Sequence, residues 1–443
     1  MNKEERLTRQ INSDANSAAL YLHRLFAALA QSEICFTEKG GLNMRRDEYK
    51  LFSRGKIAHL SVKNRLVRSA TYEGGMTEDG NVTPQILTLY KNLANGGVGT
   101  IITGHMAVKR EGKGNDRQTC IYDDCHISEV AKIADVVHGS EKDCKIIAQL
   151  SYAGRQVFHD NSVAECVGPS DVPSPILRKR ARVLAADEIR KITSCYADAI
   201  VRVKKAGFDG AQLHGAHGYL LSSFLSPHTN RRSDEYGGSI VKRVAILNEI
   251  IGKARVRVGD FPILIKTNCM DHIEGGIDSG TFPELAKVLE KLGFDAIEVS
   301  GGMWDCLSRS EEELGFFPLP IPEARTRINS LEKQSYYVSC AEGLDVNIPV
   351  MVVGGHRNVE SLEEIIQSGN IDFFSLSRPL ISEPDLPNRW LEGRGSDRAD
   401  CVSCNSCLLE VKSKPLKCIL KQNRLKQKVL KNLVPHIWKL IVK

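Results

Sequence analysis

From Leu51 onward, short apolar runs alternate with longer segments in which apolar residues recur at helical spacing. The longer segments include Ala186–Ala206, Ile240–Val258, Thr281–Leu292 and Val359–Gln367. The short runs are rich in β-branched residues, and eight of them are expected to form strands: Arg65–Ala70, Gly99–Thr103, Lys145–Leu150, Gly210–His214, Pro262–Asn268, Ala296–Ser300, Pro349–Val353 and Phe373–Leu376. Eight strands joined by helical crossovers predict an α/β fold, the closed (β/α)8 TIM barrel, rather than an open doubly wound sheet.

Both ends of the chain and one internal stretch depart from this repeat. Residues 1–44 are charged and weakly amphipathic, without the spacing of a catalytic motif, and are interpreted as an N-terminal extension. The stretch Gly301–Ile348 is longer than one crossover requires and predicts an excursion that shapes a substrate pocket. Beyond Arg378 the composition turns to proline, glycine and then cysteine. We therefore place the barrel at residues 45–395 and a cysteine-rich, basic tail at residues 396–443.

Composition indicates a soluble globular protein, with 42% hydrophobic and 26% charged residues. Much of the net charge of +6 comes from the chain after Cys418, which contains no acidic residue. No apolar run approaches the roughly 20 residues needed to span a bilayer, so we expect a cytoplasmic protein without a transmembrane segment. The basic tail is expected to be a solvated helix, with peripheral membrane or partner contact as the alternative. Nucleic acid is not an expected partner.

Polar residues or glycines stand at the carboxyl end of almost every predicted strand. In a (β/α) barrel this end carries the active site, so one ligand contacted from all sides explains the pattern. In chain order the positions are Ser69, Ala70, Thr71, Tyr72, Gly104, Gln149, His214 to Tyr219, Lys266, Ser300 to Gly302, Gly354, Gly355, Ser377 and Arg378.

The glycines after the sixth and seventh strands, followed by Arg378, are suited to a phosphate. Bare backbone N–H groups approach an anion closely, and a guanidinium adds positive charge. These positions therefore predict a phosphorylated cofactor, whose heterocycle would face Gln149 and Lys266. A lysine inside the apolar strand Ile263–Thr267 would be costly to bury without an anionic partner, and a surface salt bridge is the alternative.

Two motifs in the chain resemble those of the Old Yellow Enzyme family of NADH:flavin oxidoreductases. They are HGAHGYLL at His214–Leu221 and NRRSDEYGGS at Asn230–Ser239, within a resemblance that spans roughly Leu51 to Pro379. The resemblance implies that the bound cofactor is FMN. It also implies that FMN contacts the strand-end positions Ser69, Ala70, Thr71, Tyr72, Gly104, Gln149, Lys266, Gly354, Gly355, Ser377 and Arg378.

The same resemblance implies roles for three residues after the fourth strand. His214 and His217 would bind the carbonyl of an α,β-unsaturated substrate, so that hydride from flavin N5 adds to the β-carbon. Tyr219 would protonate the α-carbon. The implied activity is NAD(P)H-dependent reduction of an activated alkene. Structural histidines with satisfied hydrogen bonds are the alternative reading of the pair.

Two positions depart from the pattern of the family. Relatives often have a small threonine or cysteine near the flavin where this chain has Tyr72. Many also have a substrate-stacking tyrosine where this chain has Gly74. The flavin's redox properties and the substrate pocket therefore cannot be carried over from relatives.

The tail contains a C-x₂-C-x₂-C motif at Cys401, Cys404 and Cys407, followed by Cys418. Three thiols this close in a cytosolic protein indicate a metal, and a triple with a distant fourth cysteine is typical of a [4Fe–4S] cluster. Zinc sites more often pair two C-x₂-C knuckles, and both zinc and no metal stay as alternatives. The motif resembles the iron–sulfur segment of trimethylamine dehydrogenase and, less closely, that of 2,4-dienoyl-CoA reductase.

Three functional hypotheses follow from these features. The first is the ene-reductase described above. The second is an amine dehydrogenase or demethylase that passes electrons through the cysteine cluster to a separate partner. The third is a non-enzymatic flavin- or metal-binding electron-transfer module. Expected partners are a small-molecule substrate and a nicotinamide or protein electron donor, and a homo-oligomer is left open.

Overall fold

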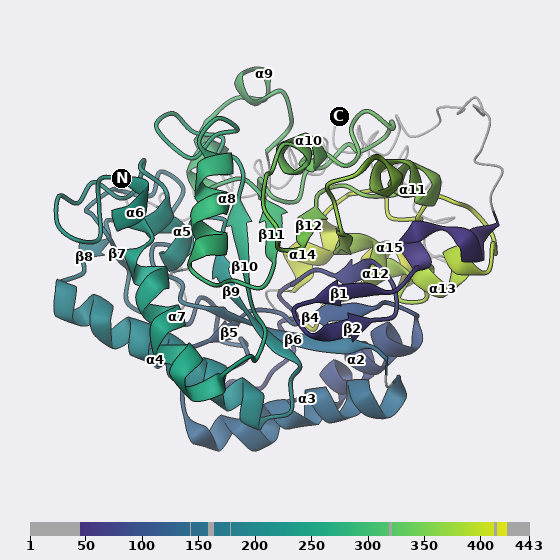
Figure 1. Ribbon diagram of the computed structural model, residues 1–443, viewed down its shortest axis with the longest axis horizontal. Helices are drawn as coiled ribbons and strands as arrows, with labels where there is room; N and C mark the ends of the chain where they lie inside the picture. The colour runs from purple at the N-terminus through teal and green to yellow at the C-terminus, as the bar shows by residue number, and fades with distance from the viewer. Residues whose placement is uncertain are drawn as a thin grey trace, which may run out of the picture.

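The computed structural model describes residues 45–141, 143–157, 164–177, 179–318, 321–411 and 414–422 (Figure 1). The expected N-terminal extension and the end of the expected tail, from residue 423 onward, lie outside the described residues. The expectations for those two segments, and the proposed boundary at residue 395, therefore stay predictions.

Eight parallel strands close into a barrel. They are β3 (Leu66–Arg68), β4 (Thr100–Ile102), β6 (Lys145–Ser151), β9 (Gly210–Gly215), β10 (Ile263–Asn268), β11 (Ile297–Ser300), β12 (Val350–Val353) and β13 (Phe373–Leu376). Their order is β4-β3-β13-β12-β11-β10-β9-β6, and a further pairing of β4 with β6 closes the ring. Each strand overlaps one of the predicted runs, so the (β/α)8 prediction is confirmed.

Helices surround the barrel, with α4 and α7 lying side by side on its outer face (Figure 1). The main helices are α2 (Pro84–Asn95), α3 (Ile127–Ser140), α4 (Ala186–Lys205), α7 (Ala245–Val258), α8 (Phe282–Lys291) and α11 (Val359–Ser368). Shorter ones are α5 (Leu220–Leu225), α6 (Ile240–Arg243), α9 (Glu311–Leu314), α10 (Val338–Glu342), α12 (Arg378–Ser382), α13 (Leu386–Leu391), α14 (Ser406–Glu410) and α15 (Ile419–Gln422). None of the helices in the described ranges combines the length and apolarity needed to cross a membrane.

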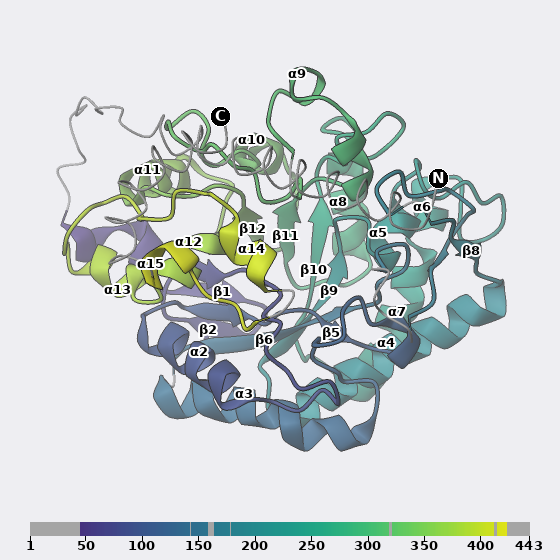
Figure 2. The same cartoon turned by 180° about the vertical axis from the view of Figure 1, so that it is seen from behind.

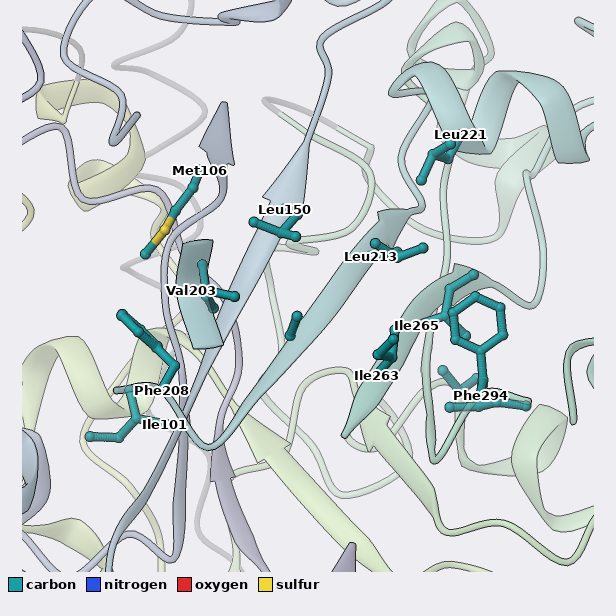
Figure 3. Packing of buried hydrophobic residues seen from close by; sticks show 14 of the residues in the cluster. Ile101, Met106, Leu150, Val203, Phe208, Leu213, Leu221, Ile263, Ile265 and Phe294 are labelled. Carbon is teal, nitrogen blue, oxygen red and sulfur yellow. The ribbon is translucent and has the colours of Figure 1, made fainter. Parts of the chain in front are cut away.

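Alternation along the strands creates two cores. In β10, Ile263 and Ile265 face the surrounding helices and belong to the outer core, in which Phe294 also packs (Figure 3). Leu264 points the other way and joins the apolar inner core of the barrel. Lys266, two residues further along the same face, is therefore directed into the barrel above that apolar layer.

A short antiparallel hairpin contributes to the inner core of the barrel. It consists of β1 (Gly55–Ile57) and β2 (Leu60–Val62). The buried side chains of Ile57 and Val62 belong to the same apolar cluster as Leu264. The hairpin therefore helps to bury the apolar layer beneath the polar interior positions.

The chain after residue 395 packs against the barrel rather than standing apart from it. The N–H of Val359 donates to the carbonyl of Asp397, and the N–H of Leu416 donates to the carbonyl of Glu73. Figure 2 shows α14 and α15 beside α12. The cysteine-bearing segment is thereby held next to the loop that follows β3.

Glu363 on α11 anchors the first described segment of the chain. Its fully buried carboxylate accepts hydrogen bonds from the backbone N–H of Lys50 at 2.8 Å and of Leu51 at 2.9 Å. The neighbouring Glu364 is exposed. The pair therefore offers a matched comparison of a buried and an exposed carboxylate on one helix.

Replacing Glu363 with alanine is expected to lower the free energy of unfolding by about 3 kcal/mol, because two N–H groups lose their acceptor inside the fold. Glu364→Ala should change it by less than about 0.5 kcal/mol. Urea denaturation followed by far-UV circular dichroism measures both. Equal effects of the two substitutions would contradict the anchoring role.

Candidate functional site

A pocket of about 400 Å³ opens at the carboxyl ends of the barrel strands. All of the predicted catalytic and cofactor-binding residues except Gly104 line it: Ser69, Ala70, Thr71, Tyr72, Gln149, His214, His217, Tyr219, Lys266, Gly354, Gly355, Ser377 and Arg378. Positions that are far apart in sequence therefore meet around one cavity, which is the arrangement expected for a single ligand.

Gly104 is not among the residues that line the pocket, and its backbone N–H forms a hydrogen bond within the protein. Its N–H donates to Oε1 of the buried Glu73 at 2.7 Å. A Cβ at this position would stand 1.9 Å from Oε2 of Glu73 and 2.8 Å from the carbonyl of Thr71. The space around Glu73 thus accounts for the glycine, and a contact between Gly104 and the cofactor stays a prediction.

A network of buried polar side chains forms the floor of the pocket. Lys266 Nζ lies 3.3 Å from Glu298 Oε2 and donates to Ser69 Oγ at 2.8 Å. Glu298 also accepts from Ser69 Oγ and from Gln212 Nε2, each at 2.8 Å, and Gln212 in turn accepts from Gln149 Nε2. Every member is buried, so the hydrogen bonds offset the cost of removing these groups from water.

Glu298 supplies the anionic partner that the burial of Lys266 requires. We did not identify it from the sequence, although the signal was present: a lone carboxylate stands inside the apolar strand β11. The argument applied to Lys266 applies equally to Glu298. Lys266 also lines the pocket, and its salt bridge with Glu298 is buried rather than at the surface. Its contact with a heterocycle stays a prediction.

His214, His217 and Tyr219 form one aromatic group on the pocket wall. The ring centroids of His214 and Tyr219 are 4.5 Å apart, and those of His214 and His217 are 5.3 Å apart. The backbone at His217 is left-handed, with φ of 63°, and its N–H donates to Asn268 Oδ1. This local turn directs all three rings into the same region.

Burial sets the protonation of these groups. It lowers the pKa values of His214 and His217 well below the usual histidine value, and it raises the pKa of the Tyr219 phenol. Both imidazoles are therefore neutral at pH 7 and the phenol keeps its proton. His217 Nε2 lies 2.8 Å from Ser300 Oγ, whereas His214 Nδ1 has no hydrogen-bonding partner within the described ranges.

The long insertion after β11 supplies Glu323, a site residue that sequence reasoning missed. Its Oε1 lies 4.0 Å from His217 Nδ1, and burial raises its pKa to about 7, although a hydrogen bond from Trp304 opposes the shift. Burial of His217 keeps that ring neutral, so we interpret the contact as polar rather than as an ion pair. The sequence predicted that the insertion shapes the pocket, but no spacing singled out this residue.

The opposite end of the pocket is suited to an anion. Gly355 has φ of 77°, and a Cβ there would lie 2.6 Å from the Tyr336 ring, so the backbone must stay bare. Arg378 donates to the carbonyl of Arg325 at 2.8 Å and to Asn405 Oδ1 at 2.5 Å. Within the described ranges no carboxylate forms a salt bridge with it, which leaves its charge for a bound phosphate.

The four tail cysteines line a second cavity, of about 290 Å³, which shares Arg378 with the first pocket. The cysteines are Cys401, Cys404, Cys407 and Cys418. Within the described ranges, no three histidine, cysteine or acidic side chains are arranged to hold a metal ion. The structure thus gathers the four predicted ligands around one cavity without showing a site for a metal ion.

The buried guanidinium of Arg357 contacts this cysteine segment. It donates to the carbonyl of Cys401 at 3.1 Å, to Cys401 Sγ at 3.8 Å and to Ser403 Oγ at 2.8 Å. Arg357 also lines the first pocket. The residue was not predicted, because only the fold brings the turn after β12 against the cysteine motif.

The cysteine segment also explains the glycine at position 74. A Cβ there would stand 2.3 Å from the carbonyl of Val411. Val411, Leu408 and Leu409 line the first pocket. The C-terminal segment therefore forms this part of the wall and leaves no room for a larger side chain at position 74.

Comparison with known proteins identifies the family. Residues 50–397 match the NADH:flavin oxidoreductase / NADH oxidase family. The chain is 36% identical over 360 residues to an NADH oxidase of Thermoanaerobacter brockii, covering 80% of this chain and 52% of that protein. It is 32% identical over 347 residues to an NADPH dehydrogenase of Halalkalibacterium halodurans, covering 77% of this chain and 93% of that protein.

A solved structure of 2-naphthoyl-CoA reductase in complex with 2-naphthoyl-CoA superposes with a TM-score of 0.75 at 25% identity. The match covers 85% of this chain and 57% of that one. The chain therefore belongs to the NADH:flavin oxidoreductase / NADH oxidase family, which confirms the resemblance to the Old Yellow Enzyme family. It spans about half the length of the NADH oxidase it matches.

Glu323 is expected to make the folded protein less stable as the pH rises. Its pKa of about 7 lies above the ordinary value of 4.5, so the folded state binds the proton more tightly, and the stability present at low pH is lost between these values. The unfolding free energy at pH 5 minus that at pH 8 should therefore be about 2 kcal/mol smaller in Glu323→Gln than in the wild type. Urea denaturation at both pH values measures it, with the exposed Glu274→Gln as control. An unchanged difference would show that Glu323 is ionised throughout.

Proposed function

We propose that the chain is an FMN-dependent oxidoreductase that uses NADH or NADPH to reduce an activated alkene, in particular an α,β-unsaturated carbonyl compound. The observation that carries the proposal is the grouping of His214, His217 and Tyr219 in a pocket that also presents an anion-binding end and a buried lysine. The family of the chain supports it, as does the similarity to a reductase whose name specifies an aromatic acyl thioester, a carbonyl conjugated with carbon–carbon double bonds.

The residues present fit FMN. Arg378 and the bare backbone of Gly354 and Gly355 would hold the phosphate, while Gln149 and Lys266 would face the ring system. Lys266 would offset negative charge on the reduced ring, since the protein already supports a buried cation at this position through Glu298. Bound FMN would supply hydride from its N5 to the β-carbon of the substrate.

The protein's own groups would polarise and protonate the substrate. Neutral imidazoles are hydrogen-bond donors, and N–H groups of His214 and His217 would bind the carbonyl oxygen and draw electron density from the alkene. Tyr219, which keeps its proton, would deliver it to the α-carbon.

Tyr219→Phe is expected to lower kcat for enone reduction by about a hundredfold, because the general acid is lost. His214→Ala should lower kcat/KM for the same substrate. Tyr122→Phe, which alters a tyrosine that packs edge-to-face with His126 and does not line the pocket, should leave both constants unchanged. Steady-state assays with NADH and NADPH measure these effects. If both site variants retain full activity with cyclohex-2-enone, the proposed mechanism is wrong.

A second candidate function, an amine dehydrogenase or demethylase that passes electrons through an iron–sulfur cluster, is favoured by the cysteine cavity. All four cysteines line one cavity of about 290 Å³, so the three closely spaced thiols and the distant fourth share the space that a [4Fe–4S] cluster would occupy. Arg357 and Arg378 beside the cysteines would offset the negative charge of a thiolate-bound cluster. These arginines also line the first pocket, so FMN and a cluster would lie next to each other.

Anaerobic purification is expected to yield protein with iron and acid-labile sulfide in about equal amounts, a brown absorption bleached by dithionite, and little zinc. Cys404→Ser should lose the iron, and Cys125→Ser, which alters an exposed cysteine elsewhere, should retain it. Full zinc occupancy without sulfide would overturn the cluster. The amine hypothesis requires that an amine bleach the flavin, and multiple turnover with any acceptor would exclude a purely non-enzymatic module.

A further inference from the structure

His105 occupies the substrate side of the first pocket and has no part in the function proposed above. It follows Gly104 in the connection from β4 to β5 (Met106–Ala107) and is 7% exposed. Its ring centroid lies 5.2 Å from that of Tyr219 and 6.0 Å from that of His214. The imidazole therefore faces the region in which the reacting part of a substrate would lie.

The hydrogen bonds behind His105 determine which of its nitrogens carries the proton. Gln118 Oε1 accepts the N–H of Gly114 at 2.8 Å, so the amide nitrogen of Gln118 must point the other way. That nitrogen, Nε2, lies 2.9 Å from His105 Nδ1 and 3.0 Å from the His105 carbonyl. The same nitrogen also lies 3.1 Å from Ser151 Oγ. An amide nitrogen donates and does not accept, so a proton on Nδ1 would face an N–H group at 2.9 Å, and this contact favours an unprotonated Nδ1.

Nδ1 also lies 2.8 Å from Ser151 Oγ, whose hydroxyl is a second donor available to that nitrogen's lone pair. Burial lowers the pKa of His105 to about 4, so the ring is neutral at pH 7 and its single proton is on Nε2. Within the described ranges, Nε2 has no hydrogen-bonding partner, and the residue lines the pocket. The protein thus presents the Nε2–H group of His105 to the pocket as a hydrogen-bond donor.

We propose that His105 Nε2–H binds a second acceptor oxygen of the substrate, distinct from the carbonyl oxygen bound by His214 and His217. The inference rests on the proposed function and narrows its substrate class to activated alkenes that carry two carbonyl or carboxylate oxygens, such as enediones and unsaturated diacids. A substrate ammonium group would meet an N–H donor at this position. His105 therefore disfavours cationic amines.

Two ketones that differ by one carbonyl test the proposal: 2,6,6-trimethylcyclohex-2-ene-1,4-dione and 2,6,6-trimethylcyclohex-2-en-1-one. The wild-type holoenzyme is expected to bind the dione about tenfold more tightly, the effect of one added hydrogen bond. His105→Phe should abolish this difference. His105→Gln, whose amide nitrogen reaches the position of Nε2, should retain it to within about threefold. Dissociation constants are obtained from the change in flavin absorbance on titration of the oxidised holoenzyme.

His126→Phe is the matched control, because it removes another buried histidine, one that packs edge-to-face with Tyr122 and does not line the pocket. It should leave the preference for the dione unchanged. Equal affinity of the wild-type holoenzyme for the two ketones would overturn the inference, and so would an equal loss of affinity for both ketones in His105→Phe.

The protonation of the ring provides a readout that does not depend on substrate. In holoenzyme labelled with ¹⁵N-histidine, the His105 signals, identified by their loss in His105→Gln, should show a protonated Nε2 and an unprotonated Nδ1 from pH 6 to pH 8. The reverse assignment would overturn the inference. If the wild-type holoenzyme prefers the dione but reduces neither ketone, the proposed function fails while the role of His105 in binding stands.

Discussion

The buried pair of Lys266 and Glu298 is the interaction on which the architecture of the site depends. Two charges removed from water are tolerated only when they are close together and their remaining hydrogen-bonding capacity is used, and here Ser69 and Gln212 meet that requirement. The pair lies above the apolar inner core to which Leu264 belongs, so the barrel interior changes from apolar to polar within a few residues of each strand. This change produces the floor of the pocket and gives a flavin-binding barrel a fixed positive group at that floor.

A second constraint comes from the C-terminal segment, which forms a wall of the pocket instead of a separate module. Val411 stands against Gly74, and Leu416 donates its N–H to Glu73. Arg378 lines both the first pocket and the cysteine cavity. Any group held by the cysteines would therefore share its protein environment with the cofactor of the barrel. The same contacts leave no room for a side chain at position 74, so the C-terminal segment itself forms that part of the wall.

On the substrate side, burial keeps the polar groups neutral, and the nearby positive charge of Lys266 acts in the same direction on His214 and His217. Histidines 105, 214 and 217 all have lowered pKa values, chiefly because they are removed from water. Each neutral imidazole supplies one N–H donor and the phenol supplies an O–H donor, and such donors are complementary to the carbonyl oxygens of the proposed substrate. Glu323, with a pKa near neutrality, is the group through which pH would alter the pocket.

The sequence by itself determined the eight strands, the face on which the site lies and many of the polar residues that line it, because alternation of side chains and the parallel barrel place every strand end at one rim. It also revealed the four cysteines as a set. It did not reveal Arg357, Glu323 or His105 as site residues, nor the reason for Gly74. Their positions depend on contacts between segments that lie far apart in the chain: the insertion folding back over the rim, the tail packing on the loop after β3, and Gln118 orienting His105. Local periodicity carries no record of such contacts, so only the tertiary structure decided which polar groups meet and which proton each of them holds.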